Sequence, residues 1–304
     1  MLVQQQFPTI DPVKLEVNPN NAAIDMLRID KVHAQVSGNK WYKLKYNLLK
    51  AKEEGQTTLL TFGGAFSNHI IATAAAAKEA GFKSIGIIRG EETLPLNPTL
   101  RLASFMGMDL HYVSRSEYRK KTTPTFITEL ENQFGDFYLV PEGGTNQVAI
   151  RGAEEILTDK LIKKYDYIVS AVGTGGTLTG LISKAEGQAE VIGISSLKGN
   201  FLTDEVKNWL SSIHKGHLTQ WTVSSNYHFG GYAKHSRELI AFINNFKIEN
   251  SIPLDPIYTG KMMYGIMDMV ANRKFKENSK VLAIHTGGLQ GIEGFNKRFG
   301  KLIY

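Results

Sequence analysis

The sequence predicts an α/β protein made of two open, twisted α/β domains with a cleft between them. Short apolar runs alternate with helical patterns along most of the chain, and the connections between them are short. This alternation is typical of parallel sheets that helices cover on both faces. At 304 residues the chain is long enough for two such domains. We expect residues 1–53 and 147–304 to form the large domain and residues 54–146 the small one.

The overall composition is that of a globular protein, with 21% charged and 42% hydrophobic residues. The net charge of +6 suits an anionic ligand, but the basic residues are scattered, so we expect no nucleic-acid partner. No stretch has the length of a membrane span or the pattern of a leader peptide, so we expect a cytoplasmic protein with no membrane partner. Cysteine is absent and no histidine pair has metal-ligand spacing, so we expect neither disulfides nor a metal site.

The first series of elements follows an irregular lead-in at residues 1–22. A short strand at 26–29 and a loop at 30–38 precede a helix that begins near Lys40 and runs to about Glu54, where Gly55 stops it. Strands and helices then alternate, with irregular loops at 94–98 and 114–121. The expected strands are 57–62, 83–88, 109–113 and 137–140, and the expected helices are 67–80, 99–106 and 124–134.

The second series begins near residue 146 and continues the alternation. A loop rich in tyrosine, histidine and glycine lies within it at 226–232. The expected helices are 146–164, 177–184, 204–213, 236–246, 261–271 and a last one from about 289. The expected strands are 167–171, 190–194, 218–223, a short one around Ile257, and 280–284.

Lys40 is the leading candidate for a reactive residue. Apolar residues recur at helical spacing after it, and Asn39 is a suitable helix cap. The positive end of this helix, the neighbouring Lys43 and partial burial all disfavour the protonated ammonium. An amine in this state is a nucleophile that reacts with an aldehyde. The alternative is that Lys40, Lys43 and Lys45 form the solvated face of a surface helix.

A second candidate stretch, Gly63-Gly64-Ala65-Phe66-Ser67-Asn68-His69, joins a strand to a helix. In open α/β sheets, ligands lie at the carboxyl ends of strands and over helix N-termini. Ser67 could bind a substrate carboxylate or move a proton there, and Asn68 could hydrogen-bond a ring oxygen. The alternative is a plain helix cap.

The stretch Val172-Gly173-Thr174-Gly175-Gly176-Thr177 also joins a strand to a helix. Its glycines let backbone N–H groups converge, its threonines add hydroxyl donors, and together they predict a phosphate cradle. No Gly-Lys-Ser/Thr ends the stretch, and Leu178 stands where a dinucleotide fingerprint needs glycine, so we expect a lone phosphate monoester. A purely structural glycine turn is the alternative.

Two later threonines, Thr259 and Thr286, each stand beside a glycine after a short predicted strand. They are expected at the same edge of the sheet as the other candidates. The loop from Tyr227 to Tyr232 adds polar aromatic side chains that could close over a ligand. Tyrosines are also common as half-buried packing residues, which is the alternative for these.

These stretches, in this order, closely resemble the 1-aminocyclopropane-1-carboxylate deaminase/D-cysteine desulfhydrase family. That family is a branch of the tryptophan-synthase-β-like pyridoxal phosphate enzymes. The resemblance implies their two-domain fold, with pyridoxal 5'-phosphate in the cleft, a small amino acid as substrate and a homodimer. The most specific matches are Gly38-Asn39-Lys40, Gly63-Gly64 with Ser67-Asn68, Gly173 to Thr177, and Asp255 to Gly260.

The resemblance also implies a role for each matching residue. Lys40 would hold the cofactor aldehyde, Asn68 would contact the ring oxygen, and Lys43 would help the loop from Gly173 to Thr177 to bind the phosphate. Ser67 corresponds to a serine near the substrate carboxylate. The remaining matches are two active-site tyrosines, Tyr258 and Tyr232, and two hydroxyls near the ring nitrogen, Thr259 and Thr286.

The two threonines distinguish the branches of the family. Deaminases that open a cyclopropane ring resemble one another in having an acidic residue where this chain has Thr259, and an apolar residue where it has Thr286. A carboxylate would keep the ring nitrogen protonated, and neutral hydroxyls would not. The pattern therefore favours β-elimination from D-cysteine or a relative, giving pyruvate, ammonia and the leaving group. The alternatives are 1-aminocyclopropane-1-carboxylate deamination to 2-oxobutanoate, a racemase or dehydratase, and a non-catalytic binding protein.

Overall fold

The computed structural model describes residues 2–304, which contain two β-sheets. The larger sheet has six strands, in the spatial order β1 (Thr9–Pro12), β2 (Ala23–Arg28), β10 (Lys280–Ile284), β7 (Tyr167–Val172), β8 (Glu190–Ser195) and β9 (Trp221–Ser224). The smaller sheet has four, in the order β5 (Met108–Val113), β4 (Lys83–Arg89), β3 (Thr58–Gly64) and β6 (Tyr138–Val140). Every neighbouring pair is parallel except β1 and β2, and the predicted α/β class is confirmed.

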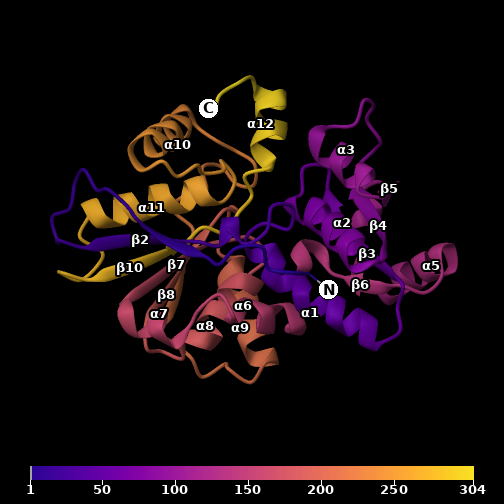
Figure 1. The fold of residues 1–304 in the computed structure, drawn as a ribbon, viewed down its shortest axis with the longest axis horizontal. Helices are drawn as coiled ribbons and strands as arrows, with labels where there is room; N and C mark the ends of the chain where they lie inside the picture. Colours follow the sequence, from indigo (N-terminus) through magenta and orange to yellow (C-terminus); the bar gives the residue numbers. More distant parts are fainter. Residues whose placement is uncertain (1) are drawn as a thin grey trace.

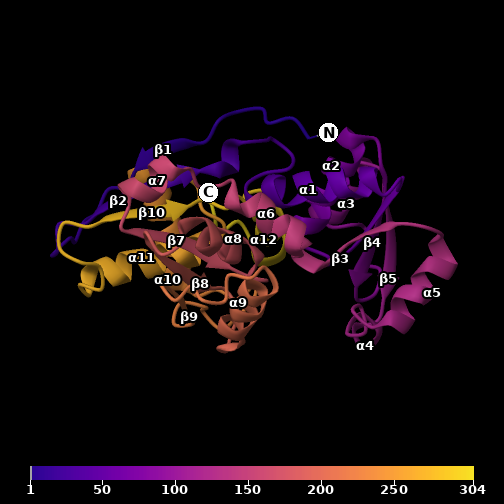
Figure 2. The same ribbon diagram turned by 90° about the horizontal axis from the view of Figure 1, so that it is seen from below.

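Helices cover both sheets and separate them. In both views α1 lies between the two sheets, as Figures 1 and 2 show. The helices before residue 140 are α1 (Asn39–Glu53), α2 (Asn68–Ala80), α3 (Pro98–Phe105), α4 (Arg115–Tyr118) and α5 (Pro124–Phe134). The later ones are α6 (Gln147–Glu154), α7 (Asp159–Lys164), α8 (Gly176–Ala185), α9 (Phe201–Ser212), α10 (Arg237–Asn250), α11 (Thr259–Ala271) and α12 (Gly291–Phe299), and short 3₁₀ turns occupy Ile29–Lys31 and Glu142–Gly144.

Residue type explains how closely these layers pack. All six residues of β7 are buried, as expected for a central parallel strand with helices on both faces. The alanine run from Ala74 to Ala77 in α2 is also buried, because small side chains let that helix lie close to its neighbours. The sheets therefore hold the carboxyl ends of their strands, and the turns that follow them, at fixed edges.

Several predicted elements differ from the structure. The lead-in contains the edge strand β1, which pairs with β2. The predicted helix 146–164 is two helices, because the chain leaves helical geometry after Glu155 and the Thr158 hydroxyl caps α7 by accepting from the Leu161 N–H. The predicted loop 114–121 contains α4, which Ser114 and Glu117 stabilise as a capping box.

Two more predictions were wrong near the glycine motifs. There is no strand around Ile257, because the Asp255 carboxylate accepts the N–H groups of Ile257 and Tyr258 and bends this segment into the start of α11. Asn39 is not the cap of α1: Gly38 holds that position, and Asn39 is the first helical residue. The other differences are shifts of element ends by a few residues.

Candidate active site

The start of α1 is fixed by the loop that follows β10. Gly38 has a φ of 65°, and a Cβ on it would lie 2.0 Å from the Thr286 carbonyl oxygen. The Asn39 N–H donates to that same oxygen at 3.2 Å. Only glycine permits this close approach of two backbones. The loop therefore sets the direction in which the next residue, Lys40, leaves the helix.

Asn39 connects Lys40 to the start of α8. The Lys40 amine donates to the Asn39 side-chain oxygen at 3.2 Å, and the Asn39 amide nitrogen donates to the Thr177 hydroxyl at 2.8 Å. Two predicted site residues from distant parts of the sequence thus lie on either side of one asparagine. The sequence predicts Asn39 as a cap, whereas in the structure its side chain positions the lysine.

Both lysines at the start of α1 are strongly affected by burial. Burial lowers the pKa of Lys40 to about 8. Lys43 is only 1% exposed and donates to the Gly143 carbonyl and the Thr145 hydroxyl, and burial followed by the Lys40 charge lowers its pKa well below the ordinary range. Within residues 2–304 neither amine forms an ion pair with a carboxylate. The burial of Lys43 excludes the solvated-face alternative for this residue. An anion beside these amines would favour their protonated forms.

The start of α8 has the character of an anion site. Gly175, with a φ of 80°, occupies the cap position, and no side chain accepts from the first N–H groups of this helix. The space around the turn is tight, since a Cβ on Gly176 would lie 2.6 Å from the Thr145 methyl group. Thr145 and Thr174 share a hydrogen bond of 2.6 Å, which joins Lys43 to this turn. Uncapped N–H groups, hydroxyls and buried amines are the donors that a phosphate dianion requires. The residues at the start of α8 therefore fit a phosphate group.

The start of α2 lies opposite the last glycine stretch. Ser67 caps α2 by accepting from the His69 N–H at 3.2 Å, as the alternative interpretation of this residue expects. A Cβ on Gly288 would lie 3.0 Å from the Asn68 amide nitrogen, so the two segments touch. Within the described residues the Asn68 side chain makes no hydrogen bond, and it is therefore available to a ligand.

The start of α11 is held by a protein carboxylate. Asp255 accepts from the N–H groups of Ile257, Tyr258 and Thr259 and from the Thr259 hydroxyl, the last at 2.7 Å. The buried Thr259 hydroxyl also accepts from the Asp255 N–H. Its proton is already donated to the Asp255 carboxylate and is not free for a ligand. Thr286 is 9% exposed, and its carbonyl holds Asn39. A contact between these two hydroxyls and a ring nitrogen stays a prediction.

The two candidate tyrosines lie against each other beside the phosphate turn. A Cβ on Gly173 would be 3.1 Å from the Tyr258 ring, and the rings of Tyr232 and Tyr258 meet edge to face at 6.2 Å between centroids. Burial raises the pKa of both phenols, and that of Tyr258 rises well above its ordinary value because Tyr232 and Asp255 add to the effect of burial. Both hydroxyls are therefore protonated near neutral pH.

Lys261 holds the loop that carries Tyr232. It is fully buried, and its amine donates to the carbonyls of His228 and Gly231 at 2.9 and 2.8 Å. Burial lowers the pKa of this amine to about 8. Sequence patterns give no role to Lys261, because the loop that it binds lies in another part of the chain.

Thr145 is a further residue that the sequence analysis missed. It bridges Lys43 and Thr174, and it follows Gly143 and Gly144 in the turn that begins two residues after β6. A strand followed by Gly-Gly-Thr is the same signal that identified the other glycine turns, so this residue was detectable. His69, by contrast, is a buried residue whose ring bonds the Thr61 hydroxyl, and burial lowers its pKa well below the ordinary value.

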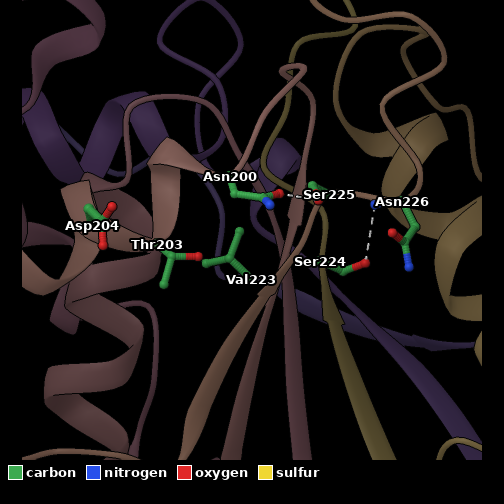
Figure 3. A pocket seen from close by; sticks show the side chains of 7 residues that line it. All are labelled: Asn200, Thr203, Asp204, Val223, Ser224, Ser225 and Asn226. Atoms are coloured by element: carbon green, nitrogen blue, oxygen red, sulfur yellow. Dashed lines mark hydrogen bonds between the residues drawn. The ribbon is translucent and has the colours of Figure 1, made fainter.

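A separate open pocket lies at the ends of β9 and α9, away from these residues. It has a volume of about 510 Å³, and Figure 3 shows its side chains, including hydrogen bonds from Ser225 to Asn200 and from the Asn226 N–H to Ser224. None of its side chains is fully buried. No predicted site residue lines it. The lining residues are Asn200, Thr203, Asp204, Val223, Ser224, Ser225 and Asn226.

Two kinds of site are absent from residues 2–304. No group of three or more histidine, aspartate or glutamate side chains there is arranged to hold a metal ion. Over the same residues, no helix combines the length and the apolar character that crossing a bilayer requires.

Comparisons with known proteins agree with this arrangement. A family described as "Pyridoxal-phosphate dependent enzyme" matches residues 30–287. A "Putative 1-aminocyclopropane-1-carboxylate deaminase" from Pyrococcus abyssi is 33% identical over 91% of this chain and 87% of its own length. A "Bifunctional D-cysteine desulfhydrase/1-aminocyclopropane-1-carboxylate deaminase, mitochondrial" from Arabidopsis thaliana is 30% identical over 90% and 74%. A crystal structure described as an "ACC deaminase homologue" superposes with a TM-score of 0.82, at 26% identity, over 100% of this chain and 96% of the other.

Proposed function

We propose, on the premise that this chain belongs to the pyridoxal-phosphate-dependent enzyme family, that it catalyses β-elimination from D-cysteine or a β-substituted relative. The family match confirms the predicted cofactor and the predicted class of enzyme. The observation that carries the proposal is the Lys40 amine, which has a pKa of about 8 and no carboxylate partner in residues 2–304. The Asn39 side chain connects this amine to Thr177 at the uncapped start of α8.

The residues that would hold the cofactor come from five segments: the starts of α1, α2, α8 and α11, and the loop after β10. Lys40 would bind its aldehyde, and Asn68 would contact the ring oxygen. Lys43 and the turn of Gly173, Thr174, Gly175, Gly176 and Thr177 would bind the phosphate, and Thr259 and Thr286 would lie near the ring nitrogen. When bound, pyridoxal phosphate supplies a ring that withdraws electrons from the Cα of an amino acid.

The chain's own groups then divide the work of elimination. The Ser67 end of α2 would bind the substrate carboxylate, because N–H groups and the positive helix end favour an anion there. The neutral Lys40 amine would remove the Cα proton. The Cα–H electron pair becomes the Cα–Cβ double bond, and the Cβ–S bond breaks with its pair on sulfur. Tyr258 and Tyr232, both protonated, are the groups that could give a proton to the departing sulfur.

The start of α11 supports elimination over ring opening. A strained carbon–carbon bond needs a protonated ring nitrogen more than a carbon–sulfur bond does. Thr259 gives this position no carboxylate, and its own proton is donated to Asp255. The alternative is deamination of 1-aminocyclopropane-1-carboxylate to 2-oxobutanoate, the activity named for the Pyrococcus abyssi relative, whereas the name of the Arabidopsis thaliana relative includes both activities.

A keto-acid assay separates these functions. Purified, cofactor-loaded protein is incubated with D-cysteine, L-cysteine, D-serine and 1-aminocyclopropane-1-carboxylate, and pyruvate and 2-oxobutanoate are measured. Pyruvate with sulfide from D-cysteine is the expected result. Formation of 2-oxobutanoate alone would show that the interpretation of Thr259 is wrong. A yellow protein that is inert toward the whole panel would indicate a binding protein without turnover.

We further propose the assembly and the division of the chain that the resemblance implies. The large domain would comprise residues 1–53 and 147–304, the small domain residues 54–146, and the enzyme would be a cytoplasmic homodimer. The position of β3 to β6 in one separate sheet supports the division. Light scattering of the eluted protein should give twice the chain mass of 33.8 kDa, and a mass equal to one chain would contradict the dimer.

A further inference from the structure

Arg89, the last residue of β4, is a charged group that the proposed reaction leaves unused. Its side chain is exposed, and no carboxylate in residues 2–304 forms an ion pair with it. Glu142, after the adjacent strand β6, is already engaged, because it accepts from the Tyr118 hydroxyl at 2.8 Å and pairs with Lys121 at 3.3 Å. Glu91 and Glu92 follow Arg89 in the sequence, but neither forms an ion pair with it. Arg89 is therefore without an ion-pair partner among the described residues.

The position of Arg89 is set by its neighbours on the small sheet. Its guanidinium lies over the Tyr118 ring, 5.6 Å from the centroid. A Cβ on Gly64 would be 3.4 Å from its Nη2 atom, and Gly64 ends β3 just before the turn to Ser67. Because parallel strands end at the same edge, Arg89 shares the ligand-binding edge of the sheet with the carboxylate site proposed at Ser67.

Arg89 also acts on the opposite side of the site. Its charge lowers the pKa of Tyr118 on the small-sheet side and that of Tyr232 on the large-sheet side, against the larger effect of burial. Tyr232 lies against Tyr258, which in turn lies against Gly173 of the phosphate turn. The Arg89 charge thus acts on Tyr232, the outer of the two tyrosines that lie against the turn of Gly173 to Thr177.

We propose that Arg89 forms a subsite for an anionic group on the β-substituent of the substrate. This inference rests on the proposed function, in which the α-carboxylate is bound at Ser67 and the β-substituent leaves beside Tyr232 and Tyr258. A guanidinium fork matches the oxygens of a carboxylate, sulfonate or phosphate, and it also stabilises a β-substituent that leaves with the bonding electron pair. Amino acids whose side chain ends in such a group are the expected substrate class.

Binding of aspartate and asparagine tests the subsite without any turnover, because neither side chain is a leaving group. Titration calorimetry of the cofactor-loaded enzyme is carried out with the D- and L-enantiomers of each amino acid. For the enantiomer that binds more tightly, the Kd of aspartate should be about tenfold lower than that of asparagine. R89M should abolish this preference, and R89K should keep part of it. K121M is the matched control and should keep the preference for aspartate. Lys121 also lies over the Tyr118 ring, but its charge is paired with Glu142.

Each other outcome overturns the proposal. The wild-type enzyme would bind aspartate and asparagine with equal affinity, or would bind neither. R89M could weaken both ligands equally, which would assign Arg89 to the α-carboxylate. An equal loss of the preference in K121M would assign the effect to the Tyr118 ring. Failure of the proposed elimination is distinguishable, because it would appear as absent keto acid while the aspartate preference persisted.

Discussion

The starts of α8 and α11 lie beside the same pair of tyrosines but are built in opposite ways. At α11, Asp255 accepts three backbone N–H groups and the Thr259 hydroxyl. At α8, Gly175 offers no side chain to the first N–H groups, and the nearby Lys40 and Lys43 have no carboxylate partner in the described residues. The protein neutralises one helix start with its own carboxylate and gives the other no side-chain cap. Four variants and one change of pH sharpen or break this contrast.

The largest effect is expected from Lys40, at the open end. K40A should reduce turnover by on the order of 10³-fold, because it removes both the amine that holds the cofactor and the base that moves the Cα proton. Keto-acid formation and the visible absorbance of the purified protein measure the two losses. K45A is the matched control, since Lys45 lies on the same helix but is paired with Glu155 outside the site. Normal activity in K40A would exclude the mechanism.

Removal of Asp255 should affect folding more than binding. D255A leaves the buried start of α11 without its cap, which should cost about 3 kcal/mol of unfolding free energy, given several charge-assisted hydrogen bonds. S236A, which removes an ordinary cap hydroxyl from α10, should cost about 1 kcal/mol. Urea denaturation of the two apoproteins gives the comparison. Equal costs would mean that Asp255 has no special part at this helix start.

The two buried lysines Lys43 and Lys261 should separate cofactor binding from loop positioning. K43M should raise the Kd of pyridoxal phosphate by about 10- to 100-fold, the range for a lost charge-assisted hydrogen bond. K261M should change that Kd little but should raise KM, because it releases the carbonyls of His228 and Gly231 that shape the Tyr232 loop. Fluorescence titration measures the Kd of pyridoxal phosphate, and steady-state kinetics measure KM. A similar loss of cofactor affinity in both variants would contradict the assignment.

The smallest effect concerns pH. The pKa of Lys40 is lowered from 10.5 to about 8, so the folded apoprotein loses this proton before the unfolded chain does. The contribution of Lys40 to the free energy of unfolding should therefore be lowest below about pH 8 and should increase between about pH 8 and 10.5. The total increase should be about 1 kcal/mol, because solvent screens part of the effect. Lys261, with a pKa also about 8, adds in the same direction. Urea midpoints across this range test the sign, and stability that falls with rising pH would contradict it.

The fold and the lysine end of the site could be predicted because their signals are local. The alternation of strands and helices gave the α/β class, and each glycine turn stood between a strand and a helix. The turn from Gly173 to Thr177 was identified in this way, the resemblance added Lys43, and the structure joins the two through Thr145.

The remaining details depend on contacts between distant parts of the chain. Gly38 takes the cap position from Asn39 because the Thr286 carbonyl leaves no room for a side chain. The Thr259 hydroxyl is committed by the way Asp255 folds back on α11, which no residue pattern records. The break between α6 and α7 falls in a stretch without glycine or proline, at residues 155–158, so its helical periodicity gave no warning.

The contact between Gly38 and Thr286 has a consequence for biosynthesis. Lys40 is translated early, but the loop that fixes its helix, and the strand β10 that flanks β2, are translated much later. Neither the pairing of β2 with β10 nor the backbone contact that directs Lys40 can form before those later residues have left the ribosome. The surroundings of this lysine are therefore assembled only after synthesis has passed β10 and the loop that follows it.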